Sequence, residues 1–154
     1  MSQYLHIFVR KNDEFAPIGS FSNGSQIYFA LSNYAPWEKV APIGSEELNV
    51  VIDNINSAIE ENNAAIQKAC DERHQVMGSP NTLEEKLSYI HEYIDSYIRE
   101  CEEENIELRD AAYFMSFLAH IVENAAHIDD IDENNYVYVG IECGYNITPE
   151  DIEE

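Results

Sequence analysis

Hydrophobic and polar positions indicate strands near both ends of the chain and helices between them. Residues 4–10 are rich in β-branched and aromatic side chains, which favours a strand, and residues 14–18 can return as its hairpin partner. Pro17 restricts that second segment to a sheet edge or a strand end. Residues 136–143 form a further apolar run. This run predicts a closing strand, which must pair with the N-terminal strands because no other strand lies near it in sequence.

A long helix is predicted from Ser45, a residue suited to the N-cap, to Gly78. Apolar residues recur in it at three- and four-residue steps, with an interruption at Asn62 and Asn63. Unbroken, it would span about 48 Å at about 1.5 Å per residue, which is longer than a compact domain of this size needs. We therefore expect either a bend at the asparagine pair or packing against another subunit.

Two further helices follow, and a short one is expected earlier, at residues 25–33. Residues 82–85 form a capping box, which begins the second helix. A turn or kink is predicted at residues 104–105, before a third helix at about 106–126 that is the most apolar and should be the most buried. The predicted apolar stripe of the second helix consists of Leu83, Leu87, Ile90, Ile94, Tyr97 and Cys101.

These elements predict an α+β fold, in which a small, mostly antiparallel sheet of N-terminal strands plus a C-terminal strand is packed on one face by three helices. A chain of 154 residues is enough for one ordinary domain, so we expect a single domain, 1–154. It would comprise a neutral β-rich part with a short helix at 1–44, an acidic helical part at 45–128, a closing strand at 135–144 and a frayed tail at 148–154.

Charge is distributed unevenly along the chain. Thirty Asp and Glu residues stand against eight Lys and Arg residues, for a formal net charge of -22. The first 44 residues are neutral, and the remaining 110 hold 27 of the acids and five of the bases. This balance argues against a protein whose main role is to bind nucleic acid directly or an anionic membrane, because both require clustered positive charge. No apolar run approaches the roughly 18 residues of a membrane span.

Two acidic clusters are the strongest functional signal. Five carboxylates fall within eight residues in the first cluster, which consists of Glu100, Glu102, Glu103, Glu104 and Glu107. In a helix they would carry one charge per roughly 2.4 Å, between the roughly 1.7 Å of duplex DNA and 3.4 Å of one strand. The second cluster consists of Asp129, Asp130, Asp132 and Glu133. Either the clusters imitate a nucleic acid and bind a basic groove, or they are a solvated face that keeps the protein soluble.

One group of residues has the chemistry of a metal site. His120, Glu123 and His127 lie at helical steps of three and four, so one face could present two imidazoles and a carboxylate to zinc or non-haem iron. The spacing matches no strict metal motif, and a polar helix flank explains these residues equally well. We therefore predict no metal and no cofactor.

The cysteines indicate no catalytic or structural role. Cys70, Cys101 and Cys143 lack CxxC spacing, so neither a zinc site nor a disulfide framework is indicated, and a reducing, cytoplasmic setting fits best. Catalytic and phosphate-binding motifs do not occur in the sequence. We predict that the chain is not an enzyme. A metal- or thiol-dependent enzyme is therefore the least favoured hypothesis for its function, after the two described next.

The preferred hypothesis is an acidic protein-interaction module or inhibitor that occupies the basic, nucleic-acid-binding surface of a partner protein, a role found in phage or mobile-element anti-defence. The alternative is a homo-oligomeric adaptor or structural module whose acidity is incidental. It would dimerise through the long helix and through Tyr89, Tyr93 and Tyr97, which fall on one helix face at four-residue spacing.

Overall fold

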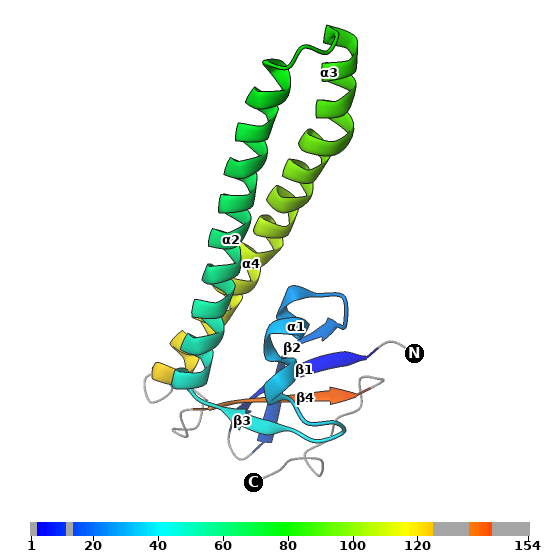
Figure 1. The fold of residues 1–154 in the computed structure, drawn as a ribbon. Helices are drawn as coiled ribbons and strands as arrows, with labels where there is room; N and C mark the ends of the chain where they lie inside the picture. Colours follow the sequence, from blue (N-terminus) through cyan, green and yellow to red (C-terminus); the bar gives the residue numbers. More distant parts are fainter. Residues whose placement is uncertain (1–2, 12–13, 125–135, 143–154) are drawn as a thin grey trace. The chain divides into compact units, whose positions relative to one another are not determined.

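The computed structural model describes residues 3–11, 14–124 and 136–142 and confirms the α+β class (Figure 1). Along the chain the elements are β1 (Tyr4–Lys11), β2 (Glu14–Ser22), α1 (Gln26–Leu31), the 3-10 turn η1 (Ser32–Tyr34), β3 (Ala41–Ile43), α2 (Ser45–Met77), α3 (Leu83–Tyr89), the π-helical segment η2 (Ile90–Asp95), α4 (Ser96–Glu123) and β4 (Val137–Glu142).

The chain divides into two compact units, which are described separately. The first, here the sheet unit, combines Met1–Asn54 with Ala111–Glu154, and the second, here the helical unit, is Ile55–Asp110. Both α2 and α4 contribute residues to each unit. That the whole chain behaves as a single domain stays a prediction.

A four-stranded antiparallel sheet, in the order β2-β1-β4-β3, forms the centre of the sheet unit. The closing strand pairs with the first strand as predicted, with Ile7 opposite Val139. Each edge strand contains a proline, Pro17 in β2 and Pro42 in β3. Edge strands tolerate proline because its missing N–H does not interrupt a central ladder. The predicted restriction of the Pro17 segment to an edge is therefore confirmed.

The strand β3 was not predicted from the sequence pattern. Three residues are too few to show a strand period in sequence. Just before β3, the backbone carbonyl of Lys39 lies where a Cβ on residue 140 would be, so β4 requires glycine at this position.

The core of the sheet unit combines one face of the sheet with helical residues. Phe21 of β2 meets Phe114 of α4 edge-on, with ring centroids 5.1 Å apart, which places this part of α4 against the sheet. Tyr113 and Phe117 are exposed, so the expectation that this helix would be the most buried is wrong at these positions. The fully buried side chains of the unit include Leu5, Ile7, Leu31, Leu48, Met115, Leu118, Val137 and Val139.

The helical unit is an antiparallel helix pair. The helix α2 ends at Met77, directly before the predicted Gly78, and the chain reverses before α3. At the start of α3 the Thr82 hydroxyl accepts a hydrogen bond from the Glu85 backbone N–H at 3.2 Å, as the predicted capping box requires. One arm of the pair is α2, and the other continues from α3 through η2 into α4. The two arms pack around a small apolar cluster of Ala69, Ile90 and Ile94, with Val76 and Ile98 against it.

Three asparagines form hydrogen bonds between α2 and α4, close to the positions where the sequence indicated an interrupted apolar pattern or a turn. Asn62 Nδ2 donates to Asn105 Oδ1 at 3.0 Å, and Asn105 Nδ2 donates to Asn63 Oδ1 at 3.1 Å. Asn105 is only 2% exposed. We call these three residues the asparagine layer. Because they bond to one another rather than to their own backbone, α2 and α4 are both continuous helices, and the turn predicted at residues 104–105 is wrong. The expected bend of α2 at Asn62 and Asn63, or its packing against another subunit, stays a prediction.

The predicted apolar stripe of the second helix is correct only in part. Ile90, Ile94 and Cys101 are buried, but Leu83 and Leu87 are more than half exposed. Tyr97 is exposed as well. Between α3 and α4 the π-helical turn η2 widens the helix, and the Ser96 hydroxyl donates to the Glu92 carbonyl oxygen there.

The asparagine layer predicts a measurable contribution to stability. Asn105→Ala should lower the free energy of unfolding by about 1–3 kcal/mol, because two amide hydrogen bonds are lost in a buried position. Urea unfolding followed by far-UV circular dichroism measures the change.

The control for this variant is Ile106→Ala, at a neighbouring position that is 58% exposed. It should change the free energy of unfolding by about 0.5 kcal/mol or less. Equal, small effects of the two substitutions would contradict a stabilising role for the asparagine layer.

Candidate functional site

The first acidic cluster lies in α4, and all five of its glutamates are exposed. At about 100° per residue, Glu100, Glu103, Glu104 and Glu107 fall within an arc of about 100° on the helix surface. Glu102 lies about 150° from the centre of that arc, on the other side of the helix. The structure therefore brings together four of the five predicted residues.

The charge spacing on this face resembles that of a nucleic acid strand. The eight residues from Glu100 to Glu107 span about 12 Å along the helix axis, so the four carboxylates carry one charge per roughly 3.0 Å. One strand of B-DNA carries one charge per roughly 3.4 Å. This value replaces the denser spacing expected when Glu102 was counted on the same face.

The second acidic cluster lies outside the described residues. It consists of Asp129, Asp130, Asp132 and Glu133. Its part in binding, and any continuity with the first cluster, stay predictions.

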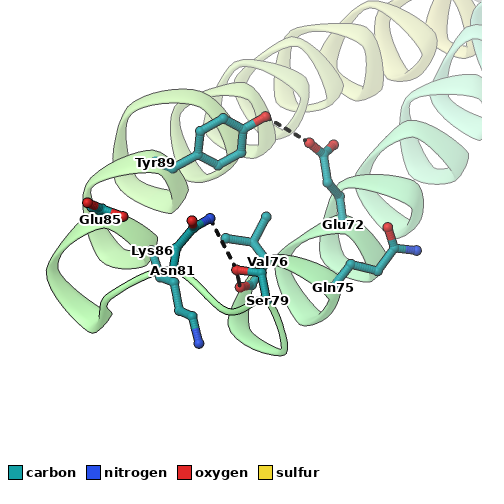
Figure 2. A pocket seen from close by; sticks show the side chains of 8 residues that line it. All are labelled: Glu72, Gln75, Val76, Ser79, Asn81, Glu85, Lys86 and Tyr89. Carbon is teal, nitrogen blue, oxygen red and sulfur yellow. Dashed lines mark hydrogen bonds between the residues drawn. The ribbon is translucent and has the colours of Figure 1, made fainter.

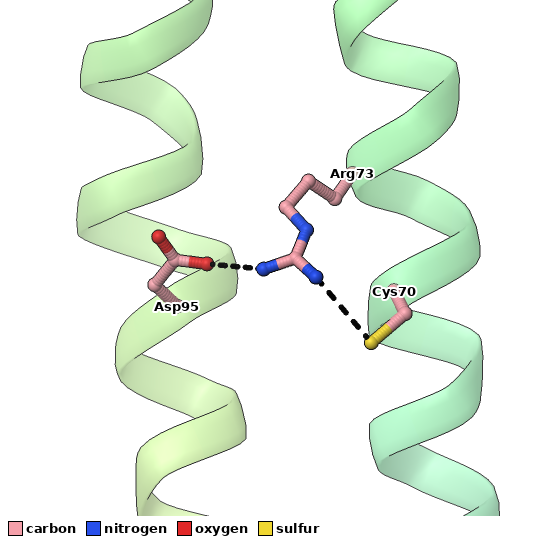
Figure 3. A network of polar contacts seen from close by, with 3 residues as sticks. All are labelled: Cys70, Arg73 and Asp95. Atoms are coloured by element: carbon pink, nitrogen blue, oxygen red, sulfur yellow. Dashed lines mark hydrogen bonds and ion pairs between the residues drawn. The ribbon is translucent and has the colours of Figure 1, made fainter.

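Basic side chains neutralise little of the negative charge of the helical unit, which has 14 acidic residues and five basic ones. Arg73 Nη1 pairs with Asp95 Oδ1 at 3.1 Å, and its Nη2 lies 3.7 Å from Cys70 Sγ (Figure 3). Lys86 Nζ donates to the Met77 carbonyl oxygen at 2.9 Å. Within residues 55–110, all of which are described, no ion pair involves the glutamates of α4. Their charge is open to a partner.

The glutamates adjoin a row of exposed tyrosines. Tyr89, Tyr93 and Tyr97 are 42%, 59% and 46% exposed, and the rings of Tyr89 and Tyr93 lie 5.1 Å apart between centroids. Tyr97 and Glu104 are seven residues apart, which places them within about 20° of each other on α4. The tyrosine row therefore continues into the acidic face.

We call this continuous surface the tyrosine–glutamate stripe. Its members recur at steps of three and four residues and are Tyr89, Tyr93, Tyr97, Glu100, Glu104 and Glu107. In sequence the tyrosines were interpreted as a dimer contact and the glutamates as a separate acidic cluster. The regular spacing from residue 89 to 107 was the signal that could have connected them.

The surroundings of Tyr89 and Tyr97 raise the pKa of both hydroxyls. The Tyr89 hydroxyl donates to Glu72 Oε1 at 3.2 Å (Figure 2), and this carboxylate raises the pKa of Tyr89. The neighbouring Cys101 thiol and, to a smaller extent, the charge of Glu100 raise the pKa of Tyr97.

Open hollows lie beside the tyrosine end of the stripe. The first, of about 500 Å³, is lined by Glu72, Gln75, Val76, Ser79, Asn81, Glu85, Lys86 and Tyr89 (Figure 2). The second, of about 690 Å³, is lined by Thr82, Glu84, Glu85, Ser88, Tyr89, Glu92 and Tyr93. Carboxylates and phenol rings dominate the second lining, and these groups favour a cationic ligand over an anionic one.

The hypothetical metal site is only partly within the described residues. His120 is exposed and its Nδ1 lies 3.2 Å from Asn124 Nδ2, whereas His127 lies outside the described range. The residues that the structure describes contain no group of three or more His, Cys, Asp or Glu side chains arranged to hold a metal ion. Cys70 and Cys101 are free thiols, and Cys143 lies outside the described residues.

Comparison with protein families, curated proteins and solved structures yields no match to the chain. In the described part of the chain, none of the helices combines the length and the apolar character needed to cross a membrane. The functional interpretation therefore rests on the geometry and charge of the chain itself.

Removing the Glu72 carboxylate tests the electrostatics at the tyrosine end. Glu72→Gln should lower the pKa of Tyr89 toward its ordinary value of 10.0, because a neutral amide favours the phenolate more than a carboxylate does. NMR titration of the tyrosine ring carbons over the alkaline range measures this pKa.

The raised pKa of Tyr89 also makes the stability of the fold depend on pH. Because folding raises the Tyr89 pKa, its contribution to stability is present at neutral pH and is lost as the pH rises through the pKa of the folded protein. Glu60→Gln, on the same helix, is the control and should leave the Tyr89 pKa unchanged. An unchanged pKa in the Glu72 variant would contradict the interaction.

Proposed function

We propose that the chain is an acidic protein-interaction module that occupies the basic, nucleic-acid-binding surface of a partner protein and thereby inhibits it. The observation that carries the proposal is the set of exposed carboxylates on one face of α4, at Glu100, Glu103, Glu104 and Glu107, without a counter-ion in the helical unit. Their spacing along the axis is close to that of a nucleic acid strand.

The mechanism is electrostatic. A groove that binds phosphates is lined by Lys and Arg, and a rigid helix that displays carboxylates at phosphate-like spacing satisfies the same groups. Long-range attraction speeds encounter, so association should be fast at low salt and should weaken as salt is raised. A role in the cytoplasm, opposing a nucleic-acid-processing system on behalf of a phage or mobile element, is part of this proposal.

The alternative is a homo-oligomeric adaptor assembled through Tyr89, Tyr93 and Tyr97. The exposure of these three rings favours it, since tyrosine is enriched at the centres of protein interfaces. A second copy would, however, bring two acidic helical units together. Light scattering at low and high salt separates the two functions, because the adaptor requires a dimer that resists salt.

Three immobilised forms of the chain test the proposed function. They are the wild type, the stripe variant Glu100→Gln/Glu104→Gln/Glu107→Gln, and the control variant Glu60→Gln/Asp71→Asn/Glu102→Gln, which removes the same charge from α2 and the other side of α4. Basic proteins from a lysate should be retained by the wild type and the control and released by added duplex DNA or RNA. The stripe variant should associate with such a partner at least about tenfold more slowly at low salt.

Two outcomes would contradict the proposal. One is equal retention by all three forms, which would show that only total charge matters. The other is retention that nucleic acid does not reverse, which would place the contact outside the partner's nucleic-acid-binding surface. Circular dichroism of each variant checks that the helices are intact.

A further inference from the structure

We infer that the tyrosine–glutamate stripe binds an arginine-rich segment of the partner in preference to a lysine-rich one. The inference rests on the proposed function and adds the chemistry of the segment that it recognises. It is carried by the juxtaposition, on one exposed helix face, of aromatic rings and carboxylates.

Arginine matches both kinds of group better than lysine does. The planar guanidinium stacks on an aromatic ring and offers a fork of donors to a carboxylate, whereas the lysine ammonium is a compact, strongly hydrated charge. A surface with carboxylates alone favours arginine only through this donor fork. Accessible tyrosine rings next to carboxylates distinguish them.

The rings of the stripe are placed for such stacking. Each of Tyr89, Tyr93 and Tyr97 keeps at least two fifths of its surface exposed, and Tyr89 and Tyr93 line an open hollow together with Glu85 and Glu92. The Tyr89 hydroxyl is held by Glu72, which limits the motion of the ring. An arginine entering here meets a ring face and a carboxylate at once.

Charge complementarity selects this occupant over a second copy of the chain. The helical unit has 14 acidic residues and five basic ones, of which Arg73 is already paired with Asp95. Two such units would face each other with like charge. A cationic segment of another protein relieves that repulsion.

The length of the stripe indicates the size of the segment. From Tyr89 to Glu107 the chain advances 18 residues, or roughly 27 Å of helix. An extended peptide of about nine residues covers roughly the same distance. Nona-arginine and nona-lysine are therefore suitable probes of equal charge.

The experiment measures the affinity of both labelled peptides by fluorescence anisotropy at one fixed ionic strength. The wild type should bind nona-arginine about tenfold more tightly than nona-lysine, since several exposed stacking contacts are added. Tyr89→Leu/Tyr93→Leu/Tyr97→Leu should reduce this preference and should weaken nona-lysine binding less than nona-arginine binding. The matched Phe substitutions should retain the preference, because they keep the rings.

A single variant, Tyr93→Leu, keeps the test valid if the triple Leu variant does not fold, and it should reduce the preference about twofold. Equal affinity of the wild type for the two peptides, or a preference of undiminished size in the folded Leu variants, would overturn the inference. The proposed function fails separately, if Glu100→Gln/Glu104→Gln/Glu107→Gln binds both peptides as tightly as Glu60→Gln/Asp71→Asn/Glu102→Gln does.

Discussion

The buried amide of Asn105 is the constraint on which the helical unit depends. A buried amide needs hydrogen-bond partners, and Asn105 has them in Asn62 and Asn63 of the opposite arm, at 3.0 and 3.1 Å. A slip of one arm by a helical turn would leave this amide unsatisfied, at about 1–3 kcal/mol. Apolar contacts around Ile94 tolerate a range of registers, so the asparagine layer supplies the specificity that the small apolar cluster lacks.

The same constraint sets which side of α4 is exposed. With Asn105 turned toward α2, the preceding Glu104 lies at the edge of the helix pair, where its carboxylate is 3.4 Å from Asn62 Nδ2. Glu100 and Glu107, one turn away on either side, then face solvent. The position of the tyrosine–glutamate stripe is thus a consequence of the buried polar contact, and the proposed binding function depends on the register of the helix pair.

Much of the fold could be predicted from local signals. The closing strand, the edge position of Pro17, and the ends of α2 near Ser45 and Gly78 follow from composition and capping chemistry, and the structure agrees. The turn predicted at residues 104–105 was wrong for a reason that no local signal reveals. Asn62 and Asn105 are poor helix formers when read singly, and only their contact across the helix pair, 43 residues apart in sequence, makes them compatible with unbroken helices.

The candidate site could be predicted less completely. The glutamates of α4 were identified from their density, but Glu102 was counted with four glutamates that lie on the other side of the helix. The tyrosines were interpreted separately, as a dimer contact. Leu83 was expected in the apolar stripe but is exposed, because sequence periodicity does not reveal which helical turns the opposite helix covers. Tertiary pairing, which decides both points, leaves no local pattern.

The central claim is that binding is concentrated on one face of α4 rather than spread over a uniformly acidic surface. The most direct measurement is a two-dimensional NMR titration of the isotope-labelled chain with an arginine-rich peptide, which reports every backbone amide separately. The account predicts that the largest shift changes fall between Tyr89 and Glu107. Changes of similar size at acidic residues throughout the chain, such as Glu46, Glu60 and Asp71, would contradict it.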